Sequence, residues 1–234
     1  GFVGHFGEGF AELAARHRVA LVGGDTTQGP LSITVTALGM VPKGEAMTRS
    51  GARAGDAVFV TGTLGDAAGA LRLTRDPGLG ARDSDRQAAA PPGSILFQRM
   101  HRPQPRVGAG LALRSFASAC IDISDGLLAD LGHVCKASGV GIEIELDALP
   151  VSAALRETFD EASCRELASA GGDDYELAFS VPEDRAGEAS RRLAAVGCAA
   201  TRIGRVIEGS GIRVLDAHGQ AIETPRTGWE HFAQ

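Results

Sequence analysis

The sequence predicts a fold of mixed helices and strands, of the α/β (α+β) class. In several short runs apolar residues alternate, and glycine-rich turns bound these runs, as is typical of strands. Between them, apolar residues recur three and four positions apart, as they do on one face of a helix. The chain has 234 residues, of which 44% are hydrophobic, so it is long enough for one large domain or for one domain and part of another.

The first part of the chain is predicted to contain a helix followed by strands. The opening residues place Phe10 and Leu13 on one face of a helix that ends near His17. Apolar runs that end in turns predict strands at residues 19–22, 31–39 and 57–61. A turn at 62–66 then leads into a helix that extends to about Leu73.

Turn residues and helical periodicity define the rest of the chain. Residues 76–93 are rich in Asp, Gly, Ala and Pro, and we predict an exposed loop there. Helices are predicted after Pro105 and at residues 127–135, 152–158, 161–170 and 185–196. Gly197 fits the C′ position of the last of these helices. Strands are predicted just before Ser124 and at residues 141–146, 176–181, 203–207 and 212–215, with a hairpin turn at His218-Gly219.

Charge and cysteine spacing argue against several classes of function. The net charge of −6 disfavours broad binding to nucleic acid or to an anionic membrane surface. No apolar run approaches the length of a membrane-spanning helix, so no membrane association is expected. The cysteines form no C-x-x-C pair, which disfavours a zinc cluster or a disulfide framework: Cys120, Cys135, Cys164 and Cys198. We therefore expect buried, reduced thiols and a cytoplasmic location.

The strongest candidate site is Ile121-Asp122-Ile123-Ser124-Asp125-Gly126-Leu127, where a strand changes to a helix. We expect unpaired N–H groups and the positive end of the helix dipole at this junction, which would suit a phosphate and its metal. Asp122 lies between two isoleucines of an apolar strand and needs a partner, for which a cation is a good candidate. The alternative is that Ser124 or Asp125 only caps the helix, although a cap does not explain Asp122.

Two further acidic turns contain paired glycines. In Gly23-Gly24-Asp25-Thr26-Thr27, Asp25 could hold Mg²⁺ while the glycines let the backbone approach phosphate oxygens. The alternative is a turn in which Asp25 or Thr26 caps the next segment. In Gly171-Gly172-Asp173-Asp174-Tyr175-Glu176, adjacent carboxylates favour a cationic partner. Here the alternative is a solvated acidic loop.

Other residues and absent motifs narrow the chemistry. Arg49, in Thr48-Arg49-Ser50-Gly51, reads locally as an ordinary exposed arginine, and Trp229, the only tryptophan, reads as a core residue. No G-x-x-x-x-G-K-[ST] or H-R-D-x-x-x-x-N pattern occurs, so this chain carries neither a P-loop nor a protein-kinase signature. G-x-S-x-G and H-E-x-x-H are absent as well.

The motifs GGDTT, TRSG, TGTLGD, IDISDG and AGGDDYE occur in this order, and through them the chain resembles the thiamine-monophosphate kinases. That family shares a superfamily with aminoimidazole ribonucleotide (AIR) synthetase and selenide, water dikinase. The resemblance implies a PurM-like two-domain kinase that transfers the γ-phosphoryl group of ATP to thiamine monophosphate, with Mg²⁺, giving thiamine diphosphate. Because the acceptor phosphate is already ionised, no separate catalytic base is expected. Another PurM-like ATP-dependent enzyme and a non-catalytic binding fragment are the alternatives.

The resemblance also implies roles for single residues, matched motif by motif. Several Mg²⁺ ions are expected to bind at Asp25, Asp122 and Asp125. ATP, the co-substrate, is expected to contact Gly24, Asp25, Arg49 and Ser124. Thiamine monophosphate is expected to contact Asp173 and Trp229, because a carboxylate and an indole suit its thiazolium cation and flat pyrimidine.

The resemblance further implies a domain organisation. Residues 1–43 are expected to be the end of an AIR synthetase-like N-terminal domain that binds ATP and Mg²⁺, and residues 44–234 a complete AIR synthetase-like C-terminal domain. The family's amino-terminal G-D-D-C/A and S-T-D runs, with their metal-binding aspartates, are absent here, so we expect part of the chain to be missing before Gly1. The N-terminal domain forms the dimer in this superfamily, and a homodimer is expected for the full-length protein.

Overall fold

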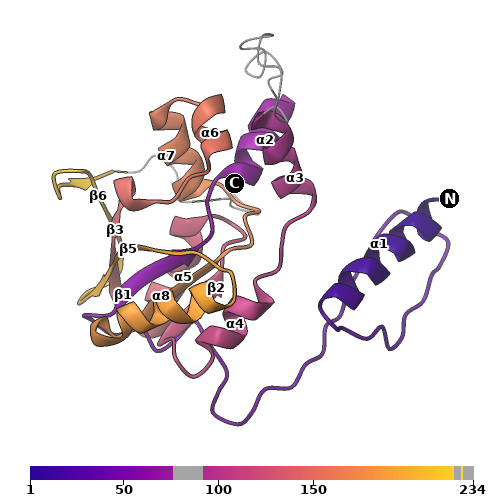
Figure 1. Ribbon diagram of the computed structural model, residues 1–234, viewed down its shortest axis with the longest axis horizontal. Helices are drawn as coiled ribbons and strands as arrows, with labels where there is room; N and C mark the ends of the chain where they lie inside the picture. Colours follow the sequence, from indigo (N-terminus) through magenta and orange to yellow (C-terminus); the bar gives the residue numbers. More distant parts are fainter. Residues whose placement is uncertain (76–91, 224–227, 229–234) are drawn as a thin grey trace. The chain divides into compact units, whose positions relative to one another are not determined.

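The chain divides into two units, Gly1–Val41 and Pro42–Gln234, at a position close to the predicted domain boundary. Figure 1 shows the computed structural model, which describes residues 1–75, 92–223 and 228. The first unit contains helix α1 (Phe2–Arg16), which confirms the predicted opening helix. The identity of each unit as a domain stays a prediction.

The strands predicted at 19–22 and 31–39 are wrong. Neither segment forms a strand, and the alternating residues Leu31, Ile33 and Val35 are 75%, 51% and 61% exposed. Alternation produces a strand only where a second backbone pairs with it. Within the described first unit α1 is the only regular element, and it offers no such backbone.

The second unit is built on a mixed sheet with the strand order β2-β4-β1-β5-β3-β6-β7. Its strands are β1 (Ala57–Thr61), β2 (Ala119–Asp122), β3 (Gly141–Glu145), β4 (Leu177–Val181), β5 (Ala200–Ile207), β6 (Gly211–Leu215) and β7 (Ala221–Ile222). β3 and β6 pair in parallel, and the other neighbours pair antiparallel. The predicted α/β (α+β) class is confirmed, as are the strands predicted for this unit and the hairpin turn between β6 and β7.

The helices of the second unit also follow the prediction, with one addition. They are α2 (Asp66–Arg75), α3 (Pro92–His101), α4 (Val107–Leu113), α5 (Leu127–Ser138), α6 (Ala153–Thr158), α7 (Glu161–Ala170) and α8 (Ala186–Ala195), with short 3-10 turns at Leu146–Ala148 and Glu183–Arg185. Helix α3 was not predicted, because Pro92-Gly93 reads as a turn although proline is tolerated in the first turn of a helix. The predicted loop therefore ends before Pro92, and its residues 76–91 lie outside the described residues.

The two faces of the sheet carry separate cores. On one face Leu127, Leu131 and Val134 of α5 pack over inward residues of several strands. On the other face α4 and α8 pack over Phe59 and Phe179, whose rings stack with centroids 5.4 Å apart. A third cluster joins α2, α3, α6 and α7 beside the sheet (Figure 1).

Smaller predictions about the ends of elements and the cysteines are confirmed. Gly197, just after α8, has a φ of +71°, the left-handed conformation that suits a helix end. All four cysteines are free and buried. No helix in the described part of the chain is long and apolar enough to cross a membrane.

Candidate functional site

Two of the three acidic turns lie side by side at the amino end of α5. We call residues 122–126 and 171–176 the acidic loop pair. Three backbone hydrogen bonds join them: the Asp173 and Tyr175 N–H groups donate to the carbonyls of Ser124 and Ile123 at 2.9 and 2.8 Å, and the Ile123 N–H donates to Glu176 O at 2.8 Å. The structure thus brings together residues of two motifs that are separate in the sequence: Asp122, Ser124, Asp125 and Asp173.

Glycines allow the two loops to approach this closely. A Cβ at Gly172 would lie 2.5 Å from the Ser124 carbonyl oxygen, and a Cβ at Gly126 would lie 2.8 Å from that of Ala170. Gly126 also has a φ of +126°, which side chains rarely adopt. A side chain at either position would therefore prevent this close approach of the backbones.

The backbone at the start of α5 differs from the prediction. Three N–H groups just before the helix are paired, because those of Ser124, Asp125 and Gly126 all donate to one oxygen, Oδ2 of Asp130, at 3.0, 3.1 and 3.1 Å. Neither Ser124 nor Asp125 caps the helix, since the N-cap is Gly126 and no side chain caps it. Asp130 was not predicted as a site residue. The sequence does single it out, because an acidic residue three positions after Leu127 lies on the apolar face of the predicted helix and needs a partner there.

Asp122 is the last residue of β2, and its side chain is exposed while Ala119, Cys120 and Ile121 are buried. The apolar neighbours of Asp122 therefore do not bury its carboxylate, and a cation as its partner stays a prediction. Solvent at the strand end already compensates its charge. The same exposure leaves the carboxylate open to a ligand that arrives from solution.

The residues of the second loop adopt unusual backbone conformations. Asp173 and Tyr175 have φ values of +66° and +51°, in the left-handed region that is uncommon for residues other than glycine. The Tyr175 hydroxyl donates to Asp173 Oδ1 at 3.1 Å. Burial raises the pKa of Tyr175, and the charges of Asp173, Asp122 and Asp125 raise it further. The three carboxylates therefore lie close enough to Tyr175 to make its surroundings acidic. Backbone strain such as the positive φ values of Asp173 and Tyr175 is common at binding sites.

The acidic loop pair supplies few metal donors by itself. Within residues 1–75, 92–223 and 228, no group of three or more His, Cys, Asp or Glu side chains is placed to hold a metal ion. Mg²⁺ in nucleotide sites takes one or two carboxylates and completes its shell with phosphate oxygens and water. Two carboxylates on one loop, beside an exposed third on the next, fit an ion that arrives with a phosphate ligand.

The inner side of the second loop is buried. Asp174 is 6% exposed; its Oδ2 accepts the Gly65 N–H at 2.8 Å, whereas its Oδ1 has no hydrogen-bond partner. Burial raises the pKa of Asp174 to about 8. Glu176 is 1% exposed, so the interpretation of this segment as a solvated acidic loop is wrong for both residues.

We predict that Asp174→Asn changes how stability depends on pH. The unfolded carboxyl loses its proton near pH 3.8 and the folded one near 8, so the native protein loses free energy of unfolding as the pH rises between these values. An amide does not titrate. The free energy of unfolding of the variant, relative to that of the parent, should therefore rise by up to about 1.4 kcal/mol for each pH unit in this range. Urea unfolding at pH 4 to 8 measures this difference; a difference that stays constant with pH would contradict the assigned cause.

Beneath the loop pair, Glu176 binds two arginines and a threonine. Its carboxylate accepts hydrogen bonds from Arg106, from Arg99 at 2.8 Å and from the Thr61 hydroxyl at 2.7 Å. Arg99 also lies 3.6 Å from Asp66, a second buried acid. The hydrogen bond to Glu176 raises the pKa of Arg106. None of these contacts was predicted, since partners so far apart in sequence leave no local pattern.

Arg49 lies elsewhere on the second unit. Its carbonyl accepts a hydrogen bond from the hydroxyl of Ser138, the last residue of α5, at 3.1 Å, and its side chain is exposed. The backbone of Arg49 is therefore at the opposite end of α5 from the acidic loop pair, about 17 Å along the helix at 1.5 Å per residue. Its role as an ATP contact stays a prediction.

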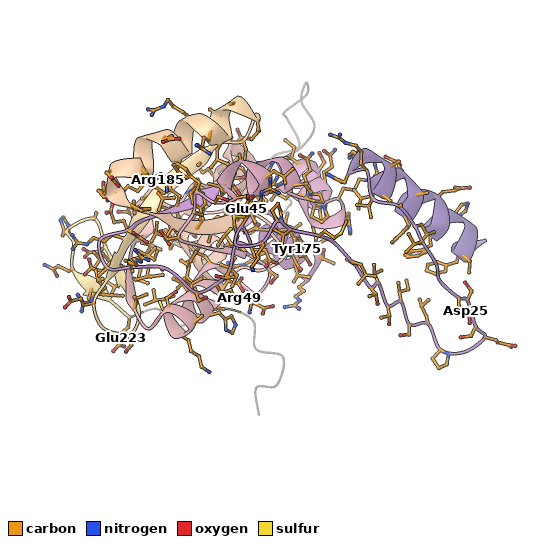
Figure 2. All side chains as sticks on the ribbon, turned by 90° about the horizontal axis from the view of Figure 1, so that it is seen from below. Asp25, Glu45, Arg49, Tyr175, Arg185 and Glu223 are labelled. Atoms are coloured by element: carbon orange, nitrogen blue, oxygen red, sulfur yellow. The ribbon has the colours of Figure 1, made fainter. Side chains whose placement is uncertain are left out.

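The remaining predicted residues lie in the first unit or near the carboxyl end. Gly24 and Asp25 are exposed on the extended segment after α1 (Figure 2). Asp25 Oδ1 accepts the Thr26 N–H at 2.7 Å, a contact expected of a turn. Trp229 lies outside the described residues. Its neighbour Gly228 lies against α5, where a Cβ would come 2.8 Å from the Asp125 carbonyl oxygen.

The chain is similar to known proteins over nearly its whole length. Residues 53–217 match the family model of the AIR synthase related protein, C-terminal domain. The chain is 41% identical over 231 residues to a thiamine-monophosphate kinase of Salmonella typhimurium, covering 97% of this chain and 68% of that protein.

Solved structures give the same result. A thiamine-monophosphate kinase from Stenotrophomonas maltophilia K279a aligns with a TM-score of 0.84 and 45% identity, over 94% of this chain and 68% of that one. A structure described as "AaThiL complexed with AMPPCP and TMP" aligns with a TM-score of 0.62 and 37% identity, over 80% and 54%.

Proposed function

Because the chain belongs to the thiamine-monophosphate kinase family, we propose that it transfers the γ-phosphoryl group of ATP to the phosphate of thiamine monophosphate, giving thiamine diphosphate and ADP. The observation that carries this proposal is the acidic loop pair, in which backbone hydrogen bonds bring the loops of the exposed Asp122, the half-buried Asp125 and the exposed Asp173 together at the start of α5. The relative solved with AMPPCP and TMP supports the same two substrates for this chain.

The metal of the reaction is proposed to be Mg²⁺, for which Asp122 and Asp125 are proposed as ligands in the second unit. In the first unit, Asp25 is proposed as a metal-binding residue. When bound, Mg²⁺ neutralises charge on the phosphates of the nucleotide. Of the chain's own residues, Ser124, Gly24 and Arg49 are proposed to contact ATP. Because the acceptor is a phosphate, orientation and charge balance suffice and no side chain has to remove a proton.

Asp173 is proposed to bind thiamine monophosphate. It is exposed, bonded to Tyr175 and adjacent to the carboxylates proposed for the metal, so a cationic ring placed there would meet negative charge. Trp229 is proposed as an aromatic contact for the same ring. The position of its neighbour Gly228 against the 122–126 loop supports this assignment.

The organisation of the molecule is also proposed. The unit boundary and the family match at 53–217 support residues 1–43 as the end of an AIR synthetase-like N-terminal domain and 44–234 as the C-terminal domain. We propose that the protein forms a homodimer. Four buried free thiols support a location in the reducing cytoplasm.

The proposal is tested by following ADP and thiamine diphosphate with Mg²⁺, ATP and thiamine monophosphate. We expect equal amounts of both products, and none when Mg²⁺ or thiamine monophosphate is left out. ADP release with a different acceptor would instead indicate another PurM-like enzyme. Calorimetry that detects binding of thiamine monophosphate with no ADP release would indicate a binding fragment, and either result would contradict the proposal.

A further inference from the structure

The carboxylate of Asp130 has none of the roles proposed above, yet it makes three hydrogen bonds to the acidic loop pair. The residue is 3% exposed and lies in the first turn of α5. One of its oxygens, Oδ2, accepts the N–H groups of three consecutive residues, Ser124 to Gly126. In the described part of the chain no arginine, lysine or histidine pairs with Asp130.

The 122–126 loop is held on its other side by the second acidic loop. The carbonyls of Ile123 and Ser124 accept the N–H groups of Tyr175 and Asp173 at 2.8 and 2.9 Å. The loop therefore directs its N–H groups to Asp130 and these carbonyls to the 171–176 loop. The backbone of the loop that carries Asp122 and Asp125 is therefore bound from both sides.

Asp130 also determines which charge the loop attracts. Consecutive N–H groups at the start of a helix form a site that favours anions, and phosphate would otherwise be a suitable occupant. Here the protein's own carboxylate fills that site. The loop then presents negative side chains in front of an internal negative charge, an arrangement that favours a cation.

We propose that Asp130 is a positioning residue of the metal–nucleotide site: it binds the backbone of residues 124–126 from within and so fixes the loop that carries the proposed metal ligands Asp122 and Asp125. This inference rests on the function proposed above. Groups that orient metal ligands from behind, without touching the metal, are known to affect metal affinity strongly.

The variant that tests this is Asp130→Asn, which keeps the size of the side chain and removes its charge. A neutral acceptor forms weaker hydrogen bonds to N–H groups than a carboxylate does. We expect affinity for Mg²⁺, titrated in the presence of a non-hydrolysable ATP analogue, to fall by about 10- to 100-fold. Hydrogen exchange of the amides of Ser124, Asp125 and Gly126 should become faster.

Asp56→Asn is the matched control. Asp56 is a buried aspartate, 4% exposed, whose carboxylate accepts the backbone N–H of Arg53 at 3.1 Å. It precedes β1 at the end of the sheet where Ala57 pairs with Val181, away from the acidic loop pair. This variant should lose stability, because it replaces a buried carboxylate that accepts a backbone N–H. It should keep the parent's Mg²⁺ affinity and the parent's rate of amide hydrogen exchange at residues 124–126.

The outcomes separate this inference from the proposed function. If the parent binds no Mg²⁺-dependent nucleotide, the proposed function fails and the role of Asp130 fails with it. If the parent binds and a folded Asp130→Asn binds equally well, only the role of Asp130 is overturned. Should Asp130→Asn not fold, Asp130→Glu retains the charge but displaces the oxygens, and the same loss of Mg²⁺ affinity is expected; unchanged affinity would again overturn the inference.

Discussion

Asp122→Asn should reduce turnover of thiamine monophosphate by about 100-fold or more while the protein stays folded. A metal ion contributes several kcal/mol of charge stabilisation in phosphoryl transfer, and each 1.4 kcal/mol is a factor of ten in rate. Asp122 is exposed at the end of β2, so its replacement should change the free energy of unfolding by no more than about 0.5 kcal/mol. Steady-state ADP release and urea unfolding measure the two effects separately.

Glu145→Gln provides the control for this variant. Glu145 is likewise an exposed carboxylate at the last position of its strand, β3, but lies four strands away in the order β2-β4-β1-β5-β3. At about 4.8 Å per strand this separates the two residues by about 19 Å. Full activity in Glu145→Gln together with near-normal turnover in Asp122→Asn would contradict the assignment of Asp122 as a metal ligand.

Local patterns were enough to predict much of the second unit. Ile121 to Leu127 changes from alternation to helical spacing within a few residues, and the structure has β2 and α5 on either side of that change. Leu177, Phe179 and Val181 alternate, and they do face one core together. These elements obtain their partners within the unit, so periodicity and burial agree.

Contacts between distant parts of the chain were beyond such patterns. The segment at 31–39 alternates as clearly as β4 does, but no second strand pairs with it in the described residues. The apolar neighbours of Asp122 suggest that its carboxylate needs a partner, yet the strand ends at that residue and the side chain is exposed. Asp130 and the arginine partners of Glu176 were not predicted for a related reason: each buried acid depends on partners that only the folded chain brings to it.

Glu176→Gln should lower the free energy of unfolding by about 3–5 kcal/mol, because it removes one member of a buried ionic cluster. The carboxylate is 1% exposed, and its partners Arg99 and Arg106 are 24% and 19% exposed. Without Glu176, Arg106 would be left with no opposing charge within the described cluster. Gly62 lies directly against this carboxylate, since a Cβ there would lie 2.2 Å from Glu176 Oε1.

Glu143→Gln is the comparison that makes this prediction specific. Glu143 also lies in the sheet and is bound by two arginines, Arg205 and Arg213, whose hydrogen bonds lower its pKa. Those arginines are 63% and 56% exposed, so water can solvate them once the carboxylate is gone. The loss in Glu143→Gln should therefore be about 1 kcal/mol or less. Equal losses for the two variants in urea unfolding at pH 7 would show that burial of the arginines does not set the cost.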